Sequence, residues 1–129
     1  MPPNRDEHTA VLYEDSMIIY GGFEDGLRTN SIYRYYFKEN KWEKVNILST
    51  SCPSPRAGHS AVMFGEKMAI FGGRDDENNK LNDIWLFDFS SYAWDYEECE
   101  HPPCGRAGHT ASLYKDMMLI FGGIIEVTK

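Results

Sequence analysis

The sequence predicts an all-β protein built of repeated four-stranded antiparallel sheets, and two observations lead to this prediction. First, one pattern occurs three times, and its histidines His8, His59 and His109 lie 51 and then 50 residues apart. A fixed period of this size indicates a repeat architecture. Second, short apolar runs alternate with turn residues, and no segment shows the sustained 3.6-residue apolar period of a helix. Helix should therefore be scarce.

Each copy opens with a pair of short strands, which we call strands A and B. In residues 56–73, "RAGHSAVMFGEKMAIFGG", two apolar runs flank a polar break and are followed by Gly-Gly. Residues 5–22 and 106–123 repeat this order. Two apolar runs joined by a few turn-type residues predict an antiparallel hairpin. Both strands are apolar on both faces, as expected for a sheet packed between neighbouring sheets.

A second hairpin, strands C and D, follows in the first two copies. The stretch "NSIYRYYFKENKW" ends at Trp42, and "NDIWLFDFSSYAW" ends at Trp94, 52 residues later. β-branched and aromatic residues, then a polar break and a Trp-led run, are typical of two strands and their turn. One full unit therefore has four strands.

Residue size predicts how the units are stacked. Strand A begins with small residues, such as Ser60 and Ala61 in the second copy, whereas strands C and D carry large ones, such as Trp85 and Trp94. Sheets arranged radially are crowded at the axis and widely spaced at the rim. Small inner and large outer side chains fit that taper.

At these positions the chain resembles the kelch-repeat family. The matching elements of the second copy are Arg56, His59-Ser60-Ala61, Ile70-Phe71-Gly72-Gly73, Asn82-Asp83-Ile84-Trp85 and Trp94. The resemblance covers essentially the whole chain and implies a kelch-type β-propeller with four-stranded antiparallel blades. It resembles most the Pro-x-Pro-Arg-x-Gly-His variety found in cytosolic and nuclear scaffold and adaptor proteins. The first copy departs from the pattern, with Asp6-Glu7 in place of Ala-Gly.

The propeller predicted from this chain is incomplete. The partial propeller, residues 1–129, divides into repeat 1 at 5–48, repeat 2 at 56–100 and a half repeat 3 at 106–129, or about two and a half blades. Propellers close with about four to eight blades. We expect an excerpt of a longer chain. The alternative is self-assembly through open blade edges, in which two chains would form a five-bladed ring.

The repeated residues are expected to be structural. They are Arg5, His8, Gly21, Gly22, Trp42, Arg56, His59, Gly72, Gly73, Trp85, Trp94, Arg106, His109, Gly122 and Gly123. A Gly-Gly pair that cradled phosphate would need a following helix, and none is predicted. A histidine and the hydroxyl residue after it point to opposite faces of a strand, so they cannot easily form a nucleophilic pair.

One cluster could be read as a metal site. Cys99, His101 and Cys104 lie within six residues, and Cys52 occupies the corresponding loop of the preceding repeat. A structural zinc needs four ligands, usually as two pairs. A plain loop is the favoured interpretation, with zinc or a Cys99–Cys104 disulfide as alternatives. We therefore expect no metal, no cofactor, no catalytic residue and no enzyme activity.

The composition bears on partners and location. The net charge is −7, with 20 acidic and 13 basic residues and no run of Lys and Arg, so nucleic acid and membrane surfaces are disfavoured as partners. The polar N-terminal segment does not resemble a signal peptide. Three cysteines and no Asn-x-Ser/Thr acceptor favour a reducing compartment, the cytoplasm or alternatively the nucleus.

The long loops carry the predicted partner-binding residues. Antiparallel blades place the B-to-C and D-to-A loops on one face, which we call the loop face. Acidic residues gather there with a few basic ones, and the predicted partner-binding residues are Glu24, Asp25, Arg28, Arg74, Asp75, Asp76, Glu77, Glu98 and Glu100. Such a face would favour a protein partner with a basic segment. The alternative is a set of solvated acids with no partner.

The predicted function is a non-catalytic protein–protein interaction module, a scaffold, adaptor or substrate-recognition propeller. Rigid blades would hold variable loops that dock another protein. Two alternatives remain open at this point. The propeller could be an appendage of a multidomain enzyme, such as a phosphatase or a ubiquitin-ligase component. It could instead be a cytoskeletal or ciliary scaffold that binds through the sides of its blades.

Overall fold

The computed structural model describes residues 1–125, and these form β-strands, turns and loops without a helix. The first sheet contains β1 (Thr9–Tyr13), β2 (Ser16–Tyr20), β5 (Ile32–Tyr36) and β6 (Lys41–Lys44), and the second contains β7 (Ser60–Phe64), β8 (Lys67–Phe71), β9 (Ile84–Asp88) and β10 (Ala93–Glu97). A third, two-stranded sheet pairs β12 (Thr110–Tyr114) with β13 (Met117–Phe121). The all-β class is therefore confirmed. Residues 126–129 of the predicted half repeat lie outside the described residues.

The strand order within each sheet follows the chain. Antiparallel ladders join β1 to β2, β2 to β5 and β5 to β6, and the second sheet repeats this order from β7 to β10. Each four-stranded sheet is thus one blade, and we call the sheets blades 1, 2 and 3, with blade 3 represented by its A–B hairpin. Two shorter ladders, β3 (Phe23–Glu24) with β4 (Leu27–Arg28) and β11 (Arg106–Ala107) with β14 (Ile124–Ile125), were not predicted from the sequence.

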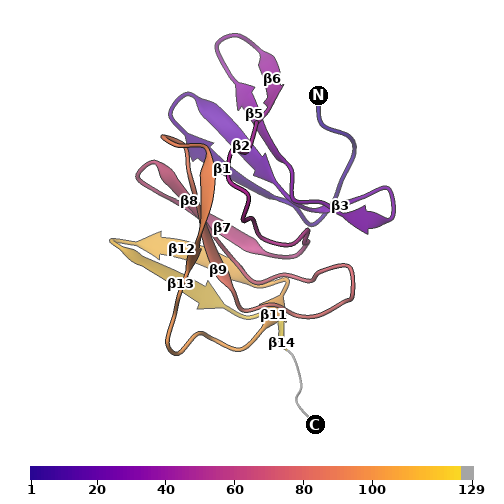
Figure 1. Ribbon diagram of the computed structural model, residues 1–129, viewed down its shortest axis with the longest axis vertical. Coiled ribbons are helices and arrows are strands. Elements are labelled where there is room, and N and C mark those ends of the chain that lie inside the picture. Colours follow the sequence, from indigo (N-terminus) through magenta and orange to yellow (C-terminus); the bar gives the residue numbers. More distant parts are fainter. Residues whose placement is uncertain (126–129) are drawn as a thin grey trace.

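The blades stack face to face with their A strands side by side. The strand β7 packs between β1 and β12, so the three A strands form the inner row. Figure 1 shows the stack, from the indigo first blade to the yellow third. Because β12 lies against β7 as β7 lies against β1, the half repeat occupies a whole blade position. The five-bladed ring of two chains, expected from counting strands, stays a prediction.

The core lies between blades 1 and 2. Blade 1 contributes Ile18, Tyr20 and Ile32, which are fully buried, and blade 2 places Phe87 and Trp94 against them. The Trp94 ring centroid lies 5.2 Å from that of Tyr20 and 5.1 Å from that of Phe87, in the tilted and edge-to-face arrangements that aromatic rings prefer. Burying each of these apolar side chains contributes about 1.5–3 kcal/mol. The large residues of the outer strands thus fill the widening space between blades.

Two-residue turns join the A and B strands. The partners Tyr13 and Ser16 close the first turn, and Phe64 and Lys67 close the second. The first turn residue has a positive φ in both, 51° at Glu14 and 63° at Gly65. Such backbone twist matches that of the paired strands.

None of the described residues forms a helix long and apolar enough to cross a membrane.

Candidate protein-interaction site

A buried arginine closes the base of the loop face in blade 2. The Arg56 guanidinium is fully buried and contacts both carboxylate oxygens of Asp83, at 2.7 and 2.8 Å. It also donates to the carbonyl oxygen of Gly72 at 3.1 Å. Burial opposes ionisation of Asp83, but the hydrogen bonds and charge of Arg56 outweigh it and lower the pKa of that carboxyl. This two-pronged ion pair joins the start of the blade to both ends of its B-to-C loop.

Blade 1 builds the same joint with a different acid. Ser31 stands where blade 2 has Asp83, and Arg5 donates to its hydroxyl at 3.4 Å. The strong partner of Arg5 is instead Glu24, at 2.7 Å, on the short strand β3. Arg5 also donates to the Gly21 carbonyl at 3.1 Å, as its counterpart does in blade 2. Glu24, predicted from sequence as a partner-binding residue, thus takes part in an internal ion pair.

The repeated histidines bridge successive blades. The Nε2 atom of His59 lies 3.0 Å from the Thr9 hydroxyl, and that of His109 lies 2.7 Å from the Ser60 hydroxyl. The hydroxyl partner thus belongs to the preceding blade and not to the residue that follows each histidine. Burial, and then the positive charge of Arg56, lower the pKa of His59 from 6.5 to about 3. His59 is therefore neutral at physiological pH.

The Gly-Gly pairs make room for this bridge. A Cβ on Gly21 would lie 2.6 Å from Cε1 of His59, and one on Gly72 would lie 2.9 Å from Cε1 of His109. The second glycine of each pair donates its N–H to the carbonyl of the next blade's arginine, at 2.9 Å in both interfaces. Close approach of two backbones is what glycine permits. The repeated motif therefore forms a joint between blades.

The acidic loop of blade 2 is held in a defined shape. The carboxylate of Asp75 accepts hydrogen bonds from the backbone N–H of Glu77 at 3.0 Å and of Asn79 at 2.9 Å. Burial opposes ionisation, but these bonds and one from the Asn79 side chain lower the pKa of Asp75. Asp76 accepts from the backbone N–H of Arg28 at 2.9 Å, which docks the loop on the β3–β4 hairpin of blade 1.

Two acids in the B-to-C loops of the loop face remain available to a partner. Asp25, at the tip of the β3–β4 hairpin, and Glu77 are exposed, and within residues 1–125 no hydrogen bond to their carboxylates is formed. Glu77 lines a hollow of about 170 Å³ together with Asp75, Asp76, Ser54 and Pro55. The negative charge of this hollow is set by three neighbouring acids.

The basic residues predicted for this face have partly structural roles. The backbone of Arg74 bridges that of Ala57 and of Lys80, and the Arg28 guanidinium lies 5.4 Å from the centre of the Phe23 ring. Both side chains are half-buried. The two arginines thus support the loops and also offset part of the negative charge of the loops.

Glu98 and Glu100 lie in another hollow. Both are exposed, and with Tyr96 and Cys99 they line a depression of about 540 Å³ at the start of the D-to-A loop. Cys52, Cys99 and Cys104 are free and exposed, and no group of three metal-ligating side chains occurs among residues 1–125. Five of the predicted partner-binding acids thus line two separate hollows, with Asp75, Asp76 and Glu77 in one and Glu98 and Glu100 in the other.

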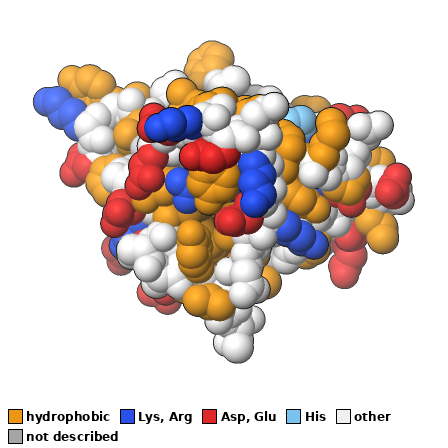
Figure 2. Space-filling view, turned by 90° about the horizontal axis from the view of Figure 1, so that it is seen from above, with side chains coloured by type: hydrophobic (Ala, Val, Ile, Leu, Met, Phe, Trp, Pro, Cys, Tyr) orange, Lys and Arg blue, Asp and Glu red, His pale blue; other side chains and the backbone are white. Residues whose placement is uncertain are grey.

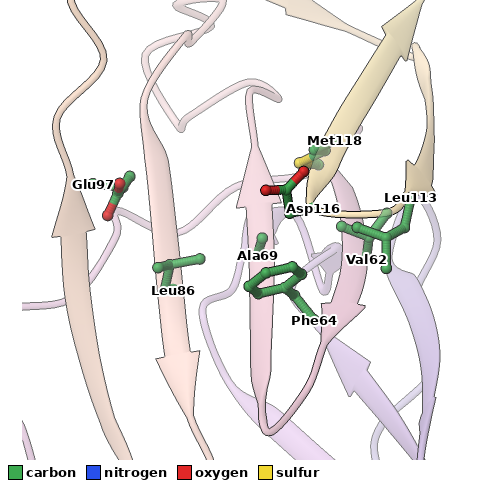
Figure 3. Close-up of a pocket in the computed structure, with 8 residues that line it drawn as sticks. All are labelled: Val62, Phe64, Ala69, Leu86, Glu97, Leu113, Asp116 and Met118. Carbon is green, nitrogen blue, oxygen red and sulfur yellow. The ribbon is translucent and has the colours of Figure 1, made fainter.

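An apolar groove separates blade 2 from the β12–β13 hairpin. Figure 3 shows its lining, with Val62, Phe64, Ala69, Leu86 and Glu97 on blade 2 and Leu113, Asp116 and Met118 on the hairpin. Its volume is about 180 Å³. The sequence did not predict this groove, because it depends on how two sheets lie against each other.

Four-stranded blades that stack through a repeated joint define a repeat protein of the β-propeller class. The family model described as "KLHDC2/KLHL20/DRC7 Kelch-repeats domain" matches residues 7–128. The chain therefore belongs to the kelch-repeat family, which confirms the resemblance inferred from the sequence.

Similar proteins place these repeats in varied contexts. The chain is 33% identical over 96 residues to human "Kelch domain-containing protein 3", a match that covers 73% of this chain and 25% of the relative. It is 37% identical over 90 residues to "Rho GTPase-activating protein gacHH" of Dictyostelium discoideum, covering 67% and 6%. It is 30% identical over 96 residues to "Dynein alpha chain, flagellar outer arm" of Chlamydomonas reinhardtii, covering 72% and 2%. The chain thus spans a quarter or less of the length of these relatives.

Proposed function

We propose that this chain is a non-catalytic interaction module that docks a basic segment of another protein on its loop face. Membership of the kelch-repeat family supports the coarser part, a role in protein–protein interaction. The acidic hollow at Asp75–Glu77 supports the finer part, since its charge complements a basic segment.

The ordered shape of the acidic loop is the observation that carries this proposal. Asp75 holds the loop through bonds to Glu77 and Asn79, and Asp76 docks it on the neighbouring blade. A binding loop that is ordered before it meets its partner loses less conformational freedom on binding. Its negative charge would also speed encounter with a basic partner at low salt.

A labelled Lys/Arg-rich peptide, titrated with the chain and followed by fluorescence anisotropy, tests the proposal. Neutralising the two available acids of the B-to-C loops, by Asp25→Asn with Glu77→Gln, should raise the dissociation constant about fivefold, since each exposed ion pair contributes about 0.5 kcal/mol. Asparagine suits position 25, where φ is 50°.

The matched control removes the same charge from the opposite face. Asp15 lies in an A-to-B turn and Glu39 in a C-to-D turn, and both are exposed. The variant Asp15→Asn with Glu39→Gln should leave the affinity within twofold. Equal weakening by both pairs would mean general charge attraction and would contradict a binding site on the loop face.

A second candidate is a propeller that serves inside a larger protein and binds through blade sides. The matches to a flagellar dynein heavy chain and to a Rho GTPase-activating protein, of which the chain spans only 2% and 6%, favour it. Leu12 on the outer side of blade 1 is 68% exposed, so an apolar side surface exists. Loss of capture of a protein partner on Leu12→Asp, with no effect of neutralising Asp25 and Glu77, would favour this candidate.

A further inference from the structure

Ser54 is an exposed residue that lines the acidic hollow of the loop face. The other residues that line this hollow are Pro55, Asp75, Asp76 and Glu77. The Ser54 hydroxyl accepts a hydrogen bond, but its own proton is donated to no acceptor within residues 1–125. Ser54 therefore offers a hydroxyl group on the surface at which we propose that a partner docks.

The Arg56 guanidinium turns one of its N–H groups toward this hydroxyl. Its five N–H donors have five acceptors, which are the Ser54 carbonyl at 3.1 Å, the Ser54 hydroxyl at 3.3 Å, the Gly72 carbonyl at 3.1 Å and the Asp83 carboxylate oxygens at 2.7 and 2.8 Å. The bond to the Ser54 hydroxyl is the longest of the five. An anionic oxygen in place of this neutral hydroxyl would receive a shorter and stronger, charge-assisted bond. Arg56 can thus stabilise a negative charge carried by Ser54.

The position of Ser54 is repeated in the other blades with different side chains. In each blade the arginine Nε donates to the carbonyl of the residue two places before it, at 3.3 Å for Pro3, 3.1 Å for Ser54 and 3.2 Å for Cys104. The backbone contact is thus common to all three, whereas only Ser54 carries a hydroxyl. Because the joint forms without a hydroxyl in the other blades, the Ser54 side chain is free to serve another purpose.

The local sequence favours Ser54 as an acceptor for a protein kinase. Ser54-Pro55 is the only Ser-Pro or Thr-Pro pair in the chain. Residues 45–56 form neither a strand nor a helix, and a proline favours extended backbone at the residue before it. An exposed serine in an extended loop, followed directly by proline, is the kind of acceptor that proline-directed kinases modify.

On the basis of the proposed docking function, we propose that Ser54 is a phosphorylation site whose phosphoryl group strengthens the binding of a basic segment. In the transfer, the Ser54 Oγ attacks the γ-phosphorus of ATP held by the kinase, and an Oγ–P bond forms. The bond from that phosphorus to the bridging oxygen breaks, and ADP leaves. The hydroxyl proton passes to the catalytic aspartate of the kinase.

The phosphoryl group would concentrate negative charge in the hollow. It adds about 1.5 to 2 negative charges beside three acids, and the guanidinium of Arg56 offsets part of their repulsion. On the face drawn in Figure 2, acidic and basic side chains lie beside one another, whereas the charged residues that line the hollow are all acidic. A basic segment would therefore associate faster and bind more tightly at the phosphorylated hollow, above all at low salt.

Treatment of the folded chain with a proline-directed kinase and Mg-ATP, followed by mass spectrometry, tests the modification. The kinase is chosen for its activity on a synthetic peptide of residues 46–57. The wild type should gain one phosphoryl group at Ser54, and Ser54→Ala should gain none. The matched control Ser51→Ala, which changes another exposed serine of the same loop, should be modified like the wild type. Modification of the peptide but not of Ser54 in the folded chain would overturn the proposal.

The labelled Lys/Arg-rich peptide, titrated with the phosphorylated and the unmodified chain, tests the effect on binding. Phosphorylation should lower the dissociation constant about fivefold at low salt, since the added charge allows about two further exposed ion pairs. The gain should shrink as the salt concentration rises, because salt screens exposed charges. Kinase-treated Ser54→Ala should keep the affinity of the unmodified chain.

The two titrations separate this proposal from the proposed function. Equal affinity of the phosphorylated and unmodified chains would overturn the role of Ser54 but leave docking on the loop face intact. Binding by the phosphorylated chain alone would support the role of Ser54 and assign docking to the modified protein. Absence of binding by both forms would overturn the effect of phosphorylation and the docking function together.

Discussion

Acidification should destabilise the fold through His59, and the structure sets the size of the effect. The ring is buried at the joint between blades 1 and 2, and its pKa is lowered to about 3 from an ordinary value of 6.5. Between these two values the unfolded chain binds a proton that the folded chain does not, so stability falls as the pH falls. From pH 7 to pH 5 the loss amounts to about 2 kcal/mol, at about 1.36 kcal/mol per pH unit below the unfolded pKa. The lowered pKa of His109 acts in the same direction.

Urea denaturation followed by tryptophan fluorescence measures this loss, because Trp94 is buried in the same interface. The control is His59→Gln, which keeps a polar side chain at the joint but cannot titrate. Its free energy of unfolding should be lower at pH 7 and should fall by about 2 kcal/mol less than that of the wild type on going to pH 5. Equal pH dependence of the two proteins would refute the assignment of a neutral, buried His59.

Three further predictions concern stability at pH 7, each measured by urea denaturation. Gly72→Ala should lower the free energy of unfolding by at least about 2 kcal/mol more than Gly65→Ala. Both glycines have a positive φ, but only at Gly72 would an added Cβ lie 2.9 Å from the carbonyl and imidazole of the next blade. Equal costs would contradict a close backbone approach. Arg56→Met should lower the free energy of unfolding by about 3 kcal/mol, because it leaves a partly buried carboxylate unpaired. Arg106→Met should lower it by under about 1 kcal/mol, because Arg106 is more exposed. A larger loss for Arg106→Met than for Arg56→Met would contradict a structural role of the Arg56–Asp83 ion pair. Phe87→Ala should cost about 3–5 kcal/mol, since the ring is fully buried between blades, and a loss below about 1 kcal/mol would show that blade 2 does not pack on blade 1 in solution.

The blade itself could be predicted from local sequence signals. Apolar runs broken by turn residues are local, so the A–B and C–D hairpins appear where the sequence places them, as at Ser60–Phe71 and Ile84–Glu97. The period of the histidines likewise predicted a repeat, and the family match over residues 7–128 confirms it. Short ladders such as β3–β4 were missed, because two residues carry too little pattern to distinguish a strand from a loop.

The contacts of the loop face could not be predicted in the same way. The sequence predicted partner binding for all of these acids equally. In the structure, Glu24 forms an ion pair with Arg5, and Asp76 accepts a hydrogen bond from the backbone N–H of Arg28, 48 residues away in the chain. Such pairings depend on the rotation between neighbouring blades, and the charge of a residue does not report that rotation.

The sequence by itself determined the repeat, the four-stranded unit and the family, because each is written in local patterns that recur at a fixed period. Only the tertiary structure decided what the recurring residues do. A histidine meets the hydroxyl of the preceding blade, a glycine leaves space for it, and an arginine closes its own loop. The physical reason is that each partner lies some 16 to 50 residues away, and the atoms meet only when strands pair within a blade, as for Arg56 and Gly72, or when blades stack, as for His59 and Thr9.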